Sequence, residues 1–186
     1  MFGTTFQPGG GGGGDLVLIK REVLSVAANA FPSITVPGDY YDLLITSRLR
    51  SNLAGTGSGG AVQFNGDAGN NYNWDVAYFN SAGAGYAGAI NVNNPVMFTC
   101  TAAGATANFW GTGSSLVADY LNNSAFKNYV SPTVQPTLNA VGGLYIYYWG
   151  GIWKNVNPIT SFVIFESNAA QFLAGSTVCA YGVGKR

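Results

Sequence analysis

The residues that most resemble a ligand site lie in the stretch 65–75, where oxygen-bearing side chains are dense. They are Asn65, Asp67, Asn70, Asn71 and Asp75. Amide and carboxylate oxygens bind Ca²⁺, but a calcium site needs about six to eight ligands and usually several carboxylates. This stretch supplies two carboxylates and lacks the closing glutamate of a calcium-binding loop. Because the same residue types form tight turns, we predict a polar loop here and no bound metal.

The inventory of ionisable side chains argues against catalysis. The chain has no histidine, which is the commonest general base and metal ligand and the usual activating partner of a serine or cysteine nucleophile. A pair of carboxylates for acid–base chemistry would have to come from Glu22, Glu166, Asp39, Asp42, Asp75 or Asp119. Both glutamates fall in predicted strands, and Asp39 and Asp42 fall in a turn, where aspartate is common. We predict that the protein is not an enzyme and uses no cofactor.

A second candidate site is the aromatic run 144–153. Alternating aromatic residues on a strand form core or subunit-interface surface, and such rings could alternatively stack on sugars. We favour an interface between subunits, which oligomerisation would bury. The partner-binding residues predicted in this run are Tyr145, Tyr147, Trp149 and Trp153.

Residues 1–14 form a region of their own, in which FGTTFQP precedes six glycines at 9–14. Polyglycine is flexible and cannot bury apolar surface, so it acts as a tether. Phe2 and Phe6 lie ahead of the tether and predict a short anchor peptide that docks into a partner. A disordered terminus is the alternative. The segment lacks the charged and apolar regions of a secretory signal.

Charge is scarce in this chain. Eight acidic and eight basic side chains give a net charge of zero and make up 9% of the residues, against about a quarter in ordinary soluble domains. Such a chain has little electrostatic protection against self-association. It has no basic run to bind nucleic acid, and its most apolar window, 144–153, is too short to cross a membrane as a helix. We therefore expect a homo-oligomer with neither nucleic acid nor membrane as partner.

The two cysteines, Cys100 and Cys179, lie far apart and form no CxxC motif. Two reduced, partly buried thiols of a protein made in the cytoplasm are the expectation, with a single disulfide as the alternative.

The elements that must position these residues are short strands separated by Gly, Pro and Asn. Apolar residues alternate with polar ones in 62–65 and 73–78, which predicts two antiparallel strands joined by a loop of about eight residues. GTGSGG at 55–60 is predicted as a flexible loop. The segment 102–136 is the least readable, with strands expected at 116–121 and 126–130 and a helical turn as the alternative. Further strands are predicted at 16–26, 31–36, 43–50, 86–92, 96–101, 144–154, 159–166 and 177–183.

These elements predict an all-β fold, an antiparallel β-sandwich of jelly-roll or another Greek-key type. It would occupy residues 15–186 as one domain, with residues 1–14 as a flexible Gly-rich arm.

Three segments resemble a known group of proteins. FNGDAGNNYNW at 64–74 and ITSFVIFESNAAQFLAGSTVCAYGV at 159–183, with YYDLLITSRLRS at 40–51, resemble small virion structural proteins of tailed bacteriophages and prophages. The resemblance runs from about residue 16 to 184 and leaves out the arm and 102–136. It implies a jelly-roll sandwich that assembles as a homo-oligomer, often a trimer, on the outside of a virus particle. It brings no catalytic residues.

Within that group we expect a capsid decoration (cement) protein, made in the host cytoplasm and attached through residues 1–14 to the major capsid protein or another virion protein. The alternative is a receptor- or glycan-binding tip of a head or tail fibre. The tether favours decoration, since a fibre tip normally follows a long shaft sequence.

Overall fold

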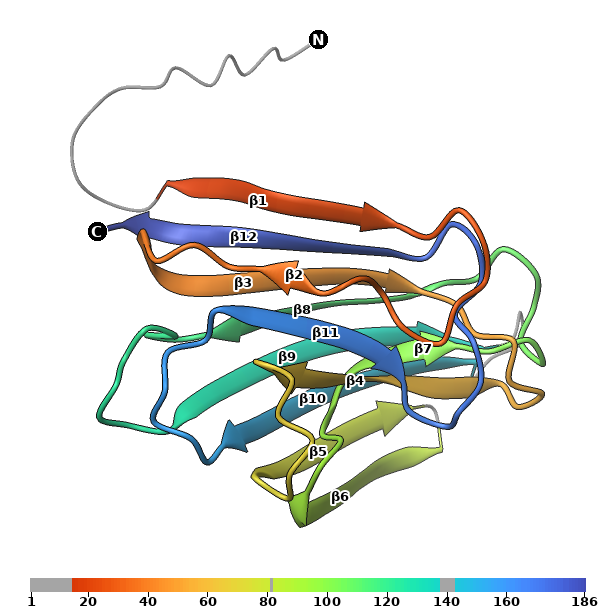
Figure 1. Cartoon of the computed structure of the whole chain (residues 1–186). Helices are drawn as coiled ribbons and strands as arrows, with labels where there is room; N and C mark the ends of the chain where they lie inside the picture. Colours follow the sequence, from red (N-terminus) through yellow and green to blue (C-terminus); the bar gives the residue numbers. More distant parts are fainter. Residues whose placement is uncertain (1–14, 81, 138–142) are drawn as a thin grey trace, which may run out of the picture.

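The computed structural model describes residues 15–80, 82–137 and 143–186, which form two antiparallel sheets packed as a sandwich (Figure 1). None of these residues lies in a helix long and apolar enough to cross a membrane. The strands are β1 (Leu16–Val23), β2 (Ile34–Thr35), β3 (Tyr40–Leu49), β4 (Gly57–Phe64), β5 (Tyr72–Asn80), β6 (Gly83–Val92), β7 (Val96–Thr101), β8 (Gly111–Val117), β9 (Lys127–Pro136), β10 (Leu144–Trp153), β11 (Ser161–Glu166) and β12 (Thr177–Lys185).

The strand order is that of a jelly roll with one enlarged sheet. The large sheet runs β1-β12-β3-β8-β9-β10-β5-β6 and the small sheet runs β2-β11-β4-β7. The sets β1-β12-β3-β8 and β2-β11-β4-β7 are the two halves of an eight-stranded jelly roll. The pairs β5–β6 and β9–β10 are insertions that widen the large sheet, and Figure 1 shows β5 and β6 at the end opposite β1. The predicted sandwich is confirmed, and the arm 1–14 lies outside the described residues.

The core lies between the sheets and follows the alternation of each strand. Leu43, Ile45 and Leu49 of β3 are fully buried, as are Val62 and Phe64 of β4. Each buried side chain of this size contributes about 1.5–3 kcal/mol through the hydrophobic effect. The period of two therefore predicted the inner faces of β3 and β4 correctly.

Strands β4 and β5 exist as predicted but do not pair with each other. β4 lies in the small sheet between β11 and β7, and β5 lies in the large sheet between β10 and β6. The chain turns at Asn65 and Gly66, both with positive φ, and then crosses from one sheet to the other. Packed sheets are about 10 Å apart, a gap that the polar loop can span and a tight hairpin turn cannot.

Residues Gly57–Gly60 were predicted as a flexible loop, and this prediction is wrong. They form the first half of β4, paired with β7 and, at Gly60, with Glu166 of β11. A side chain at Gly57 would overlap Gln135 Nε2, and a Cβ at Gly59 would lie 2.7 Å from Ser167 Oγ. Glycine in a strand interior commonly marks such a close approach.

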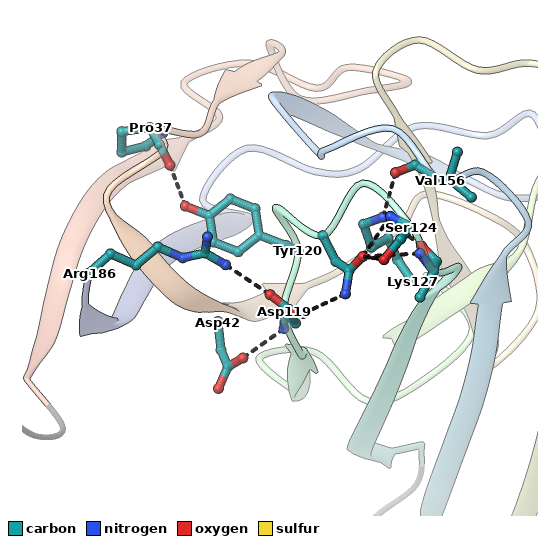
Figure 2. Close-up of polar contacts among 10 residues, drawn as sticks. Pro37, Asp42, Asp119, Tyr120, Ser124, Lys127, Val156 and Arg186 are labelled. Carbon is teal, nitrogen blue, oxygen red and sulfur yellow. Dashed lines mark hydrogen bonds and ion pairs between the residues drawn. The ribbon is translucent and has the colours of Figure 1, made fainter.

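The segment 118–126 joins β8 to β9 as a loop, so the strand predicted at 116–121 ends at Val117 (Figure 2). Residues 118–121 form a single hydrogen-bonded turn, in which the Asn122 N–H donates to the Asp119 carbonyl at 2.9 Å, and no helix. Asp42 Oδ1 accepts a hydrogen bond from the Asp119 backbone N–H at 2.8 Å, and Arg186 donates to Asp119 Oδ1 at 2.8 Å. The buried Tyr120 donates its hydroxyl hydrogen to the Pro37 carbonyl. Contacts from distant parts of the chain thus set the conformation of this loop.

Two buried cations hold further loops in place. Arg50, 8% exposed, donates to the carbonyls of Ala105, Thr106 and Phe109 at 3.2, 3.0 and 2.6 Å. Lys127, 1% exposed, donates to the carbonyls of Ala125 and Val156 at 2.9 and 3.1 Å (Figure 2). Burial lowers the pKa of Lys127. Buried charges need such partners because an unpaired one is costly.

The buried carboxylate of Glu166 joins three segments. It accepts hydrogen bonds from the hydroxyls of Ser51 and Ser58 and from the backbone N–H groups of Asn168 and Ala170 at 2.7 and 3.0 Å. The Ser51 bond is 3.1 Å long. Glu166 therefore ties the loop after β11 to β4 and to the end of β3.

Replacing Glu166 tests this role. Glu166→Ala leaves buried donors unpaired, and we expect a loss of about 3 kcal/mol in the free energy of unfolding. The control is Glu22→Ala on edge strand β1, where the carboxylate pairs with the exposed Lys20 at 3.2 Å. That change should cost less than about 0.5 kcal/mol. Urea unfolding measures both, and equal midpoints for the two variants would contradict the assignment.

Candidate functional site

Strand β10 presents different side chains on its two faces. Tyr145, Tyr147, Trp149 and Trp153 lie on the inner face, directed toward the small sheet, and their exposure falls from partial at Tyr145 to none at Trp153. The residues between them lie on the outer face and are more exposed: Leu144, Ile146, Tyr148 and Ile152. The four aromatic residues of this strand that the sequence predicted to bind a partner therefore share the inner face.

Trp153 is a core residue. Its ring packs against Phe64 and Tyr72 at centroid distances of 5.6 and 6.4 Å, and it is fully buried. Its indole N–H donates to Asp67 Oδ2 at 2.7 Å. Trp153 thus fastens the 65–71 loop to β10 and contributes no surface for a partner.

Tyr145, Tyr147 and Trp149 form a continuous row of rings. Neighbouring centroids are 5.8 and 5.7 Å apart, with interplanar angles of 17° and 16°. Trp74 and Tyr78 of β5 support the row, with centroids 5.4 Å from Trp149 and 5.8 Å from Tyr147. The indole N–H of Trp149 donates to Thr133 Oγ1 at 3.2 Å. The row is therefore held in place by its neighbours in the large sheet.

A groove of about 470 Å³ lies along this row. At this end of β4 the space beside Gly57 and Gly59 is filled by Gln135, Ser167 and Val96, which also line the groove, whereas Phe64 at the other end of β4 packs on Trp153. None of the described residues that line it is charged. The lining residues are Thr56, Gly57, Ser58, Gly59, Val96, Thr99, Gln135, Thr137, Tyr145, Tyr147, Trp149, Ser167 and Asn168.

Hydrogen bonds to neighbouring groups hold several of the polar side chains that line the groove in place. Asn168 Nδ2 donates to Ser58 Oγ at 2.8 Å, and Ser58 in turn donates to Glu166 behind the groove wall. Gln135 Nε2 lies 3.3 Å from the Cys100 carbonyl oxygen, to which it donates. Thr99 differs: its hydroxyl is buried and has no hydrogen-bond partner within the described part of the chain.

Of the polar stretch 65–75, residues 65–71 form the loop and Asp75 lies in β5, and the loop is held by hydrogen bonds to its polar side chains. Asp67 accepts hydrogen bonds from Trp153, from the Gly69 N–H and from Asn71. Burial alone would raise the pKa of Asp67, but these bonds together hold it below its ordinary value. Asn65 Oδ1 accepts from the Thr160 N–H at 2.8 Å. These oxygens already have partners, and the described residues contain no cluster of three or more His, Cys, Asp or Glu that could hold a metal.

The thiols are free, so the disulfide alternative is not formed. Cys100 is buried in β7, and Cys179 is partly exposed on β12. Burial, together with the charge of Glu166, raises the pKa of the Cys100 thiol, which makes it a poor nucleophile. The carboxylates of Asp42, Asp119 and Glu166 already accept hydrogen bonds that hold loops in place.

The outer face of the large sheet carries an apolar patch, the outer patch, which the sequence predictions missed. Ile146 lies beside Val134 and Phe79 in the strand register, and Tyr148 lies beside Pro132. The even-numbered apolar residues of β10 are the sequence signal for this patch. Its large members, each 37% to 60% exposed, are Phe79, Leu116, Val130, Val134, Leu144, Ile146, Tyr148 and Ile152.

Alkaline titration tests the burial of the aromatic row. Burial, with Tyr145 and Tyr78 nearby, raises the pKa of Tyr147 to about 12, from an ordinary value of about 10. The unfolded chain releases the Tyr147 hydroxyl proton at lower pH than the folded chain does. The contribution of Tyr147 to the free energy of unfolding is therefore full below pH about 10 and is lost as the pH rises toward about 12. Tyr147→Phe should lose less stability over this interval than the wild type, and the exposed-site control Tyr86→Phe should match the wild type. Urea unfolding at each pH measures the three stabilities. Equal losses in all three proteins would contradict the raised pKa of Tyr147.

The chain matches no protein-family profile, no curated protein and no solved structure.

Proposed function

We propose that this protein is a structural subunit of a bacteriophage particle, a capsid decoration protein, which self-associates through the outer patch. The observation that carries the proposal is a set of eight large exposed apolar side chains on one sheet face of a chain with zero net charge and only 9% charged residues. Exposed apolar surfaces of this kind mark interaction sites in soluble proteins.

A second copy of the chain is the partner that best fits the outer patch. Strands β8, β9 and β10 contain a single charged residue, Lys127, and it is buried. The neighbouring strand β5 adds the exposed Asp75, which lies beside Gly150 in the strand register. A largely apolar face is complementary to itself, and homo-oligomer interfaces are the more apolar class. A net charge of zero gives no long-range repulsion between copies.

The assignment to a virus particle rests on two supports. The jelly-roll strand order occurs in viral capsid domains, and it also occurs in lectins and other proteins. The resemblance of segments 40–51, 64–74 and 159–183 to small phage virion proteins favours the viral role among these. Decoration is favoured over a fibre tip by the glycine tether at 9–14. The anchor residues Phe2 and Phe6 lie outside the described residues, and their role stays a prediction.

A single substitution in the outer patch tests self-association. Tyr148→Glu places a charge in the interface, and we expect the oligomer to dissociate to the 19.4 kDa monomer. Phe126→Glu is the matched control, because Phe126 is 54% exposed and Tyr148 is 53% exposed, but Phe126 lies in the loop before β9. Sedimentation velocity gives the masses. A wild-type monomer, or an oligomer that tolerates Tyr148→Glu, would overturn this interface.

Copy number in purified particles separates decoration from a fibre tip. A decoration protein is expected at a stoichiometry comparable to that of the shell protein, whereas a tip is expected in a few copies. Deleting residues 1–14 should leave the oligomer folded and abolish its attachment to the particle. Normal attachment of the truncated protein would show that the arm is not the anchor.

A further inference from the structure

We propose that the groove beside Tyr145, Tyr147 and Trp149 binds a neutral carbohydrate chain. This inference is independent of self-association, because the groove lies on the inner side of β10 and the outer patch on the other side. It would hold equally for a monomer.

The lining of the groove fits a ligand that is polar and uncharged. Its polar groups are the hydroxyls of serine, threonine and tyrosine and the side-chain amides of Gln135 and Asn168. None of the described lining residues is Asp, Glu, Lys or Arg, so a phosphate or sulfate group would find no charged partner there. Hydroxyls and amides both donate and accept hydrogen bonds. They match the hydroxyl groups of a sugar.

The aromatic row supplies the apolar part of such a site. A pyranose ring carries C–H groups on its faces and hydroxyls around its edge, so it combines well with aromatic side chains flanked by polar groups. Tyr145, Tyr147 and Trp149 follow one another along the strand at 5.8 and 5.7 Å. A row favours a chain of several sugar units over a single one. The row is also supported from β5, so little ordering is needed on binding.

The Thr99 hydroxyl is an independent pointer to a ligand. Thr99 is 2% exposed, lines the groove, and has no hydrogen-bond partner for its Oγ1 within the described residues. Buried polar groups are almost always paired. Less than 1 Å² of Thr99 Oγ1 is accessible in this structure, so the groove must widen beside Thr99 before a ligand hydroxyl can pair with it.

A peptide that adds a strand to the sheet fits less well. The strand of the small sheet that borders the groove is edge strand β7, and strand addition would need its free backbone groups. Residues 97–101 of β7 are buried, so this edge is covered by the large sheet. The ligand must therefore be recognised by side chains, which is how sugars are bound.

The test measures binding of the protein to a printed array of neutral oligosaccharides, including maltohexaose, cellohexaose and chitohexaose. Sialylated and phosphorylated glycans on the same array serve as the charged comparison. We expect binding to a neutral glycan of three or more units. The affinity for that glycan is then measured by tryptophan fluorescence, since Trp149 lines the groove. Tyr145→Ala should weaken binding at least about ten-fold, and Tyr86→Ala, at a 90% exposed site outside the groove, should leave it unchanged.

Thr99→Val distinguishes a ligand-binding hydroxyl from a structural one. The change is nearly isosteric and removes an unpaired buried hydroxyl, so the melting temperature should stay the same or rise. The affinity for the glycan should fall about ten-fold. Binding to no neutral glycan, binding only to charged glycans, or affinity unchanged in both Tyr145→Ala and Thr99→Val would overturn the proposal. A monomeric wild type that still binds the glycan would overturn self-association and leave this site standing.

Discussion

The unequal widths of the two sheets determine the rest of this structure. Eight strands face four, so the small sheet does not cover the whole inner face of the large one. Where β4 ends in Val62 and Phe64, the gap is filled and Trp153 becomes core. At the other end, where β4 begins with glycines, a groove with an aromatic lining remains. The buried Trp153 and the groove thus lie at opposite ends of β4.

The same geometry gives β10 two faces with different side chains. Successive side chains of a strand point to opposite faces, so Tyr147 lies in the groove while Tyr148 lies in the outer patch. One face can bind a ligand while the other contacts a second subunit. An assembly built in this way would keep its grooves open, because contact between outer faces does not occupy the inner ones.

The sequence predicts individual strands well because alternation is a local property. The strands predicted at 96–101 and 144–154 agree with β7 and β10 within one residue. Pairing is not local: β4 and β5 are joined by one loop yet lie in different sheets. The strand at Gly57–Gly60 was missed because its glycines are required by close contacts with Gln135 and Ser167, which no local pattern shows. The loop 118–126 likewise depends on Asp42 and Arg186, which are distant in the chain.

The sequence predicted the strand that carries the candidate site but not which of its faces is turned inward. Period two divides the run 144–153 into two rows, but both rows are apolar or aromatic, so the pattern cannot say which row faces inward. The sequence analysis predicts the aromatic row as a partner surface. The structure places this row on the inner face, with Trp153 in the core. The outer row became visible only once the sheet order was known.

Hydroxyl-radical footprinting of the protein in solution tests most directly the claim that the outer face of β10 is buried between subunits. The account predicts that Phe79, Ile146 and Tyr148 are oxidised far more slowly than Phe126, although Phe79, Tyr148 and Phe126 are 47%, 53% and 54% exposed in the single chain. The protection should disappear on dilution to the monomer. Oxidation of Tyr148 at the same rate as Phe126 at every concentration would contradict the account.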